Sequence, residues 1–241
     1  MGYYWTYYLV IMFAAYAAEN PWVCLVVVLF FALRRFLPDP VAIARNLGRI
    51  GRLRAQAELN AANAVARRDL GRSYLELRMP RTALKYLDQA AVIDPKNRDV
   101  AYLRGKALLR AGRPEEALAA LGISLGIDPE TGEFRSAASH QGAANASMRD
   151  GDAYLAAAEA LERLERWEQM AEVLSAAARC NMSSLEALVR LARVRHRLHD
   201  EKGAREALDE ARRTWRQLPR FSRRGQFAWW LRAQLGRFVL P

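Results

Sequence analysis

Residues able to do chemistry are few in this sequence, and they do not form a reaction centre. His196 and His199 lie three residues apart beside Asp200 and Glu201. One helical turn would bring both imidazoles together, but two ligands do not close a zinc site, so we expect a surface pair. Cys180 has no base partner nearby in the sequence. Glycine-rich phosphate loops, nucleophile elbows and Cys/His metal spacings are also absent, so the sequence predicts no enzyme, no cofactor and no metal.

Arginine dominates the remaining polar residues. The 241-residue chain has 37 Lys+Arg against 26 Asp+Glu, a formal net charge of +11. Such a chain attracts acidic protein segments, anionic membranes or nucleic acid, and arginine pairs carboxylates in a two-pronged geometry. The two cysteines, Cys24 and Cys180, lie in segments of different character. No disulfide framework is therefore expected, which fits a reducing compartment.

The elements that carry these arginines repeat along the chain. Residues 64–97 and 98–131 align at an offset of 34 residues. The matched positions are Gly71 with Gly105, Ala83 with Ala117, Leu87 with Leu121, and Asp94-Pro95 with Asp128-Pro129. Small residues allow two helices to cross closely, and proline ends a helix at or before the residue that precedes it. Each segment therefore reads as two crossed helices followed by a break.

This 34-residue pattern resembles the tetratricopeptide repeat family, whose unit is a helix–turn–helix. The pattern departs from the family at Arg104, where leucine is usual, and at Ala101, where tryptophan is frequent. The resemblance implies an all-α solenoid, here over residues 64–218, with a broad inner binding surface.

The register resumes after an insertion of residues 132–150, in degenerate repeats at 151–184 and 185–218. A weak helix from about 134 to 148 is expected inside the insertion. One extra helix would change the parity of the stack. The sequence leaves open whether the insertion loops outside the solenoid or moves every later helix to the opposite layer.

In the family, six positions on the first helix of each repeat line the inner surface. Carried over to this sequence, they give candidate partner-binding residues Arg68, Arg72, Tyr102, Lys106, Arg110, Arg190, Arg193 and Arg197, the last three if the register survives the insertion. This lining favours an acidic or amphipathic segment of a partner protein. The alternative is a set of solvated surface charges. The family's carboxylate clamp needs asparagine at the sixth position, which here is Asp69 and Leu103, so its ligand is not expected.

Residues 1–37 read as a two-helix transmembrane hairpin. The apolar arms 3–18 and 21–37 flank Glu19 and Asn20, and each is near the lower limit of about 17 residues for a bilayer span. A single span would bury Glu19 at mid-membrane, whereas a hairpin places it in water. The alternatives are a cleaved signal peptide, a re-entrant hairpin that does not cross, and an apolar pair within a soluble core.

A basic amphipathic connector helix is expected in residues 38–63. The candidate membrane-surface residues are Arg34, Arg35, Arg45, Arg49 and Arg52. The positive-inside rule places both ends of the hairpin, and the solenoid, in the cytoplasm of a bacterial cell at its inner membrane. The alternative is a helix that packs on the first repeat with a solvated basic face.

Residues 219–241 predict a helix that caps the last repeat. The apolar stripe expected to pack consists of Phe227, Trp230, Leu231, Leu235 and Phe238. No acid follows Glu210, whereas eight arginines do. The alternative is thus a basic, tryptophan-rich face that binds anionic lipid or nucleic acid, of which nucleic acid is less favoured.

Together these features predict a membrane-anchored scaffold rather than an enzyme. Its cytoplasmic solenoid would bind a partner protein, alongside membrane subunits, within a complex of the secretion, polysaccharide-export or envelope-assembly type. The competing hypothesis is a basic protein that binds nucleic acid or anionic lipid through its C-terminal face.

Overall fold

The structure is a computed structural model that describes residues 12, 16, 19, 20, 22, 40–125, 148–180 and 183–239. The described ranges contain helices and no strand, in agreement with the expected all-α fold. The helices are α3 (Pro40–Leu59), α4 (Ala64–Glu76), α5 (Pro80–Ile93), α6 (Arg98–Arg110), α7 (Pro114–Leu125), α9 (Met148–Arg163), α10 (Trp167–Cys180), α11 (Leu185–Arg197), α12 (Glu201–Gln217) and α13 (Arg220–Val239).

The expected hairpin of residues 1–37 lies outside the described residues, apart from five isolated positions. Among the helices that the structure describes, none has both the length and the apolar character of a membrane span. The expected helix at 134–148 also lies outside the described residues, except for Met148 at the start of α9.

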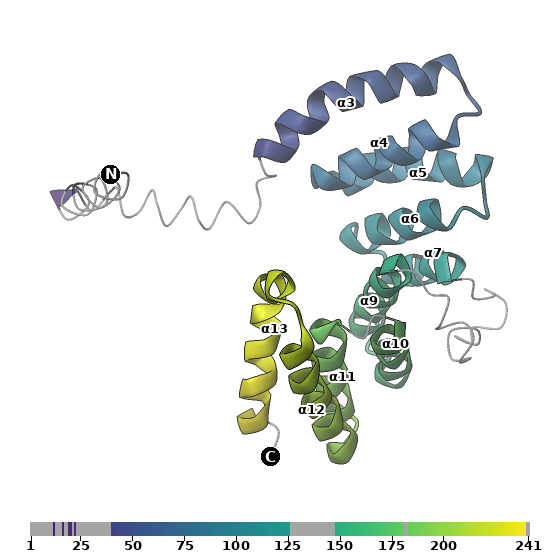
Figure 1. Cartoon of the computed structure of the whole chain (residues 1–241). Helices are drawn as coiled ribbons and strands as arrows, with labels where there is room; N and C mark the ends of the chain where they lie inside the picture. The colour runs from purple at the N-terminus through teal and green to yellow at the C-terminus, as the bar shows by residue number, and fades with distance from the viewer. Residues whose placement is uncertain are drawn as a thin grey trace.

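Consecutive helices pack against each other from α3 to α13 and form one curved stack (Figure 1). Helix α4 contacts α6, and α6 contacts α9. No comparable contact joins α5 to α7, or α7 to α10, in the described part of the chain. Because the first helices of successive repeats lie closer together than the second helices, the stack curves toward the layer of α4, α6, α9 and α11. This layer is called the inner surface below.

The contacts of α9 decide the layer of the later helices. Helix α9 packs on α7 and α6, as α6 packs on α5 and α4. It therefore takes the place of the first helix of a third repeat. The helices after the insertion consequently stay in the layers they would occupy without it.

The turn inside each repeat has the same backbone in all four repeats. One residue in each has a positive φ, namely Arg78 (58°), Gly112 (79°), Glu165 (56°) and His199 (60°). The amide that follows donates to a carbonyl five residues back, as from Met79 to Tyr74 at 2.9 Å. This is the Schellman end of a helix. The turn residues are spaced by 34, 53 and 34 positions, so the insertion adds 19 residues and leaves the repeat unchanged.

Side-chain caps start the first helix of three repeats. Asn63 accepts a hydrogen bond from the amide of Ala66, Asn97 from that of Val100, and Ser184 from that of Ala187. Each cap satisfies an amide that the helix leaves without a partner. The start of these three inner-surface helices is therefore set locally.

The matched glycines lie where the two helices of a repeat cross, as expected from the sequence. A Cβ built on Gly105 would lie 2.5 Å from Cγ of Leu121 and 3.3 Å from the carbonyl oxygen of Ala117. One on Gly71 would overlap Cγ of Leu87. Both leucines are fully buried. The glycines thus set how closely the inner-surface helices approach their partners.

Helix α13 covers the end of the stack with a different face from the predicted one. Ala233 is fully buried, Trp229 packs against the core, and Oε1 of Gln226 accepts a hydrogen bond of 2.9 Å from the amide of Leu185. Close contact with α11 and α12 requires a small side chain and a cap for the start of α11. The helix therefore turns Ala233 and Gln226 inward.

The apolar stripe predicted to pack there is instead exposed. Phe227, Leu231 and Leu235 are 52%, 44% and 52% exposed. Trp230 is half-buried against Trp215, with ring centroids 5.2 Å apart, and the side chain of Phe238 lies outside the described residues. The prediction of this stripe as the capping face was wrong for Leu231 and Leu235, whereas Phe227 and Trp230 do contact Trp215 of α12. The closest contact with the stack admits only a small side chain, which hydrophobicity alone does not indicate.

Candidate partner-binding surface

The candidate residues lie on three helices of the inner surface. Helix α4 carries Arg68 and Arg72, α6 carries Tyr102, Lys106 and Arg110, and α11 carries Arg190, Arg193 and Arg197. The structure therefore places them in one layer of the curved stack (Figure 1). The hydrogen bonds and ion pairs of these residues show which side chains hold the stack together and which are available to a ligand.

Arg68 ties the first two repeats together. Its guanidinium lies 3.0 Å from Asp69 on α4 and 3.6 Å from Asp99 on α6. Arg49 of α3 adds a longer contact of 3.9 Å to Asp69. Because Arg68 already has two carboxylates, an incoming acidic segment would have to compete for it.

Arg110 has a structural role that recurs in the next repeat. Its Nη1 donates to the carbonyl oxygen of Leu75, at the end of α4, at 2.6 Å. Arg163 of α9 donates in the same way to the carbonyl oxygen of Leu109, at the end of α6, at 2.5 Å. Each carbonyl also accepts a hydrogen bond of 3.1 Å from a backbone amide, Leu75 from Arg78 and Leu109 from Gly112, so the arginine adds a second donor. The cation also faces the negative end of the helix dipole. Each arginine thereby links its own repeat to the preceding one.

Apart from Arg110, four candidate cations of the inner surface have no carboxylate partner among the described residues: Arg72, Lys106, Arg193 and Arg197. The Nζ of Lys106 lies 3.2 Å from the hydroxyl of Tyr102 and 5.2 Å from the centre of its ring. Arg193 is exposed, and Arg72 is half-buried. These are the charges that an acidic ligand meets without displacing an existing ion pair.

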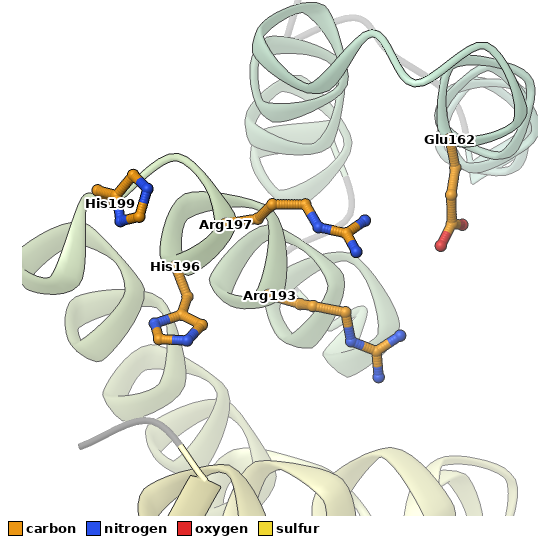
Figure 2. Close-up of a pocket in the computed structure, with 5 residues that line it drawn as sticks. All are labelled: Glu162, Arg193, His196, Arg197 and His199. Carbon is orange, nitrogen blue, oxygen red and sulfur yellow. The ribbon is translucent and has the colours of Figure 1, made fainter.

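A hollow of about 550 Å³ opens on the inner surface between α9 and α11. It is lined by Glu162, Arg193, His196, Arg197 and His199. Figure 2 shows Arg193 and Arg197 extending side by side from α11, with Glu162 facing them from α9. The α9–α11 pair lacks the contact that joins α4 to α6 and α6 to α9. The hollow therefore lies where the inner layer is widest.

Neighbouring side chains hold two residues of the hollow, Arg197 and His196, in place. The guanidinium of Arg197 lies 4.3 Å from the centre of the Trp167 ring, a cation–π contact. Nδ1 of His196 lies 2.7 Å from Oε1 of Glu201. Arginine that is stacked on an aromatic ring keeps its charge and its remaining donors for a second partner, so Arg197 stays available to an anion.

The candidate residues predicted a basic inner surface, but the structure also places acidic side chains there. Arg190 lies 3.8 Å from Glu162 of α9 and 3.5 Å from Glu186. Helix α9 also carries Glu159, paired with Arg163 at 2.7 Å. Sequence reasoning named no residue of α9, although the 19-residue shift would have placed Glu162 in the lining. Two basic areas are thus separated by the acidic groups of α9.

The proposed membrane-surface arginines are only partly described. Arg34, Arg35 and the side chain of Arg45 lie outside the described residues. Arg52 is exposed and donates to the carbonyl oxygen of Gly48 at 3.4 Å.

Helix α3 packs on α4, which was the alternative reading of this segment. Leu53 and Ala57 face the core, and Nη2 of Arg54 donates to the hydroxyl of Tyr74 at 2.9 Å. This hydrogen bond raises the pKa of Arg54 above its ordinary value. The connector is therefore part of the solenoid, whatever its basic face contacts.

The histidine pair has no metal-site geometry. His199 occupies the positive-φ turn position and His196 is held by Glu201. Within the described ranges, no group of three His, Cys, Asp or Glu residues is placed to hold a metal ion.

The sequence of residues 74–140 matches the profile of the tetratricopeptide repeat family. No curated protein sequence matches the chain significantly. The fold is similar to that of MamA from Desulfovibrio magneticus RS-1, with a TM-score of 0.56 and 18% identity over 70% of this chain and 84% of that one.

Two further solved structures share the fold. YrrB, described as a tetratricopeptide repeat protein with an unusual peptide-binding site, has a TM-score of 0.55 and 16% identity over 72% of this chain and 80% of its own. PilW, described as a type IV pilus biogenesis factor, has a TM-score of 0.51 and 16% identity over 75% of this chain and 80% of its own. The profile match shows that residues 74–140 carry tetratricopeptide repeats, and the recurring turns and these shared folds show that the rest of the described stack has the same helix–turn–helix architecture.

Proposed function

We propose that this protein is a membrane-anchored scaffold whose inner surface binds an acidic or amphipathic segment of a partner protein. The observation that carries the proposal is the set of inner-surface cations without a carboxylate partner among the described residues, Arg72, Lys106, Arg193 and Arg197. A partner carboxylate gains a charge-assisted hydrogen bond from each of them and breaks no internal ion pair.

The shape of the surface supports a polypeptide ligand rather than a small molecule. The hollow is open, and its arginines lie on α11, one of the helices that form the extended inner surface. Solenoids of this kind present an extended concave face to a partner. YrrB, which shares the fold, is described by its peptide-binding site, and this likeness favours a peptide segment as the ligand.

The anchor of the proposed scaffold is the apolar segment 1–37, whose two arms fit a hairpin in the inner membrane. In this arrangement the solenoid faces the cytoplasm and meets membrane subunits of a larger complex. An envelope-assembly process is consistent with the description of PilW as a pilus biogenesis factor. The scaffold would act by holding its partner near the bilayer, since nothing in the inner surface points to catalysis.

The test is purification of the intact complex from membranes in mild detergent, with the co-purifying chains identified. The triple variant Arg72→Glu, Lys106→Glu and Arg193→Glu should lose its partner. Each charged hydrogen bond is worth about 1.5–3 kcal/mol, so affinity should fall at least tenfold per contact. Arg81→Glu, an exposed position on α5 outside the inner layer, is the matched control.

Both variants should keep the helical circular dichroism of the parent chain. Loss of the same co-purifying chain in the triple variant, with retention in the control, supports the inner surface as the binding site. Full retention in the triple variant would exclude it. A chain found only in the aqueous fraction would remove the anchor and leave the binding surface to be tested separately.

A further inference from the structure

A row of side chains on α13 is exposed, and Phe227 at its edge also contacts Trp215 of α12, with ring centres 6.4 Å apart. Arg220, Arg224, Phe227, Leu231 and Leu235 recur at helical spacing and form what is called here the outer stripe. It lies opposite the face that carries buried Ala233. The row begins with two exposed arginines and continues with three apolar side chains that are 44% to 52% exposed.

The packing of α13 on the stack does not require these exposed apolar side chains. Helix α13 already buries its opposite face against α11 and α12. Phe221, at 82% exposed, adds a further ring beside the stripe. Phe227 also belongs to an aromatic cluster, because its ring centre lies 5.4 Å from that of Trp230. Contiguous exposed apolar surface of this kind marks an interaction site.

Charge narrows the choice of partner. Helix α13 contains five arginines and no acidic residue. Among the described residues, Arg220 and Arg224 form no ion pair, and Arg223 donates only to the carbonyl oxygens of Leu218 and Arg216. The guanidinium of Arg232 is stacked 4.4 Å from the centre of the Trp229 ring. The surface around the stripe is therefore positive and unneutralised.

We propose that the outer stripe of α13 docks on a bilayer surface that contains anionic lipid. Phenylalanine and leucine side chains enter the boundary between headgroups and acyl chains. The arginines remain at headgroup level, where their long side chains reach lipid phosphates. Tryptophan rings next to the stripe suit the same depth. This contact is separate from segment 1–37 and from the inner surface.

Other occupants fit the stripe less well. A second copy would bring arginines against arginines with no acid to offset them, and like charges that are brought face to face weaken association. Nucleic acid would neutralise the arginines, but its phosphate backbone offers no apolar phase to Phe227 and Leu231. An anionic bilayer satisfies both the charge and the apolar row.

The experiment places an environment-sensitive fluorophore on the full chain, with Cys24 and Cys180 replaced by serine. One variant carries the label at Leu231→Cys on the outer stripe. The matched control carries the label at Val92→Cys on α5. The side chain of Val92 is 81% exposed, and α5 lies far from α13 in the stack (Figure 1). Both are incorporated into vesicles of phosphatidylcholine alone, or of equal parts phosphatidylcholine and phosphatidylglycerol.

Segment 1–37 can anchor the chain in either vesicle, so anchoring alone predicts no difference between them. Docking predicts a blue shift of the label at 231 in phosphatidylglycerol vesicles only, and none at 92. Arg220→Gln with Arg224→Gln should lower the equilibrium constant for docking about fivefold per arginine. High salt should weaken docking in the same direction.

The proposal is overturned by a label at 231 that keeps its emission in buffer when phosphatidylglycerol is present. It is equally overturned by a matching shift at 92, which would show nonspecific adsorption. A blue shift in buffer that grows with protein concentration would assign the stripe to a second copy instead. None of these results depends on whether the inner surface binds its partner.

Discussion

Replacing Gly105 by alanine is expected to destabilise the second repeat, although alanine is the better helix former. The added Cβ would lie 2.5 Å from Cγ of Leu121 and 2.8 Å from its Cδ2. Leu121 is fully buried, and close-packed protein interiors leave little room for a side chain to change rotamer. The backbone oxygen of Ala117, at 3.3 Å, limits the movement of α7 as well.

Two opposing terms set the magnitude. Overpacking a buried contact costs about 1–3 kcal/mol, whereas alanine gains about 0.8–1.0 kcal/mol over glycine in a helix interior. The net expected loss for Gly105→Ala is about 0–2 kcal/mol, toward the upper end because the contact is so close. Gly51→Ala in α3 is the matched control, because nothing lies within 4 Å of its added Cβ. That substitution should stabilise the chain.

The assay is urea unfolding of the full chain, followed by far-ultraviolet circular dichroism. The two substitutions should shift the midpoint in opposite directions. Adding Leu121→Ala to Gly105→Ala removes the clash, so the double variant should lose less stability than the sum of the singles. Stabilisation by Gly105→Ala, or strict additivity, would refute the claim that close crossing sets the geometry of α6.

Two further predictions concern the turns and caps that define the repeats. Gly112→Ala should destabilise by about 1 kcal/mol, whereas Glu165→Gly, at φ 56°, should stabilise or be neutral, since non-glycine residues are strained there. The same urea unfolding measures both, and loss of stability in each would contradict the strain argument. Asn97→Ala should cost about 1 kcal/mol through loss of its cap on Val100. Asn97→Ser, which restores a capping oxygen, is its control; equal losses in both would assign the effect to something other than the cap.

The inner surface divides its arginines between structure and binding. Arg110 and Arg163 are held by the carbonyl ends of the preceding helices, and Arg68 is held by two carboxylates. These contacts fix the spacing of the repeats, and therefore the positions of the remaining cations on the inner surface. A preorganised surface loses less entropy when a partner binds, so under the proposed function the structural arginines would contribute to binding without contacting the partner.

The repeat could be predicted from the amino-acid sequence, since the signals that mark it are local. Crossing glycines, prolines at repeat ends and a 34-residue offset are set by residues close in the chain, and the structure confirms the crossing at Gly71 and Gly105. The all-α class follows from the same signals. The scaffold class rests on the family, whereas the membrane hairpin remains a prediction from the apolar arms alone.

Packing between remote segments sets which inner-surface cations lack an internal partner. It also sets which face of α13 packs against α11 and α12. Whether Arg110 binds a ligand depends on the carbonyl of Leu75, which lies in another repeat. The layer of α9 depends on its contacts with α6 and α7. The exposure of Phe227 and Leu231 depends on the close fit of Ala233 against the stack. Such outcomes are set by distances between segments remote in sequence, and no local pattern encodes them.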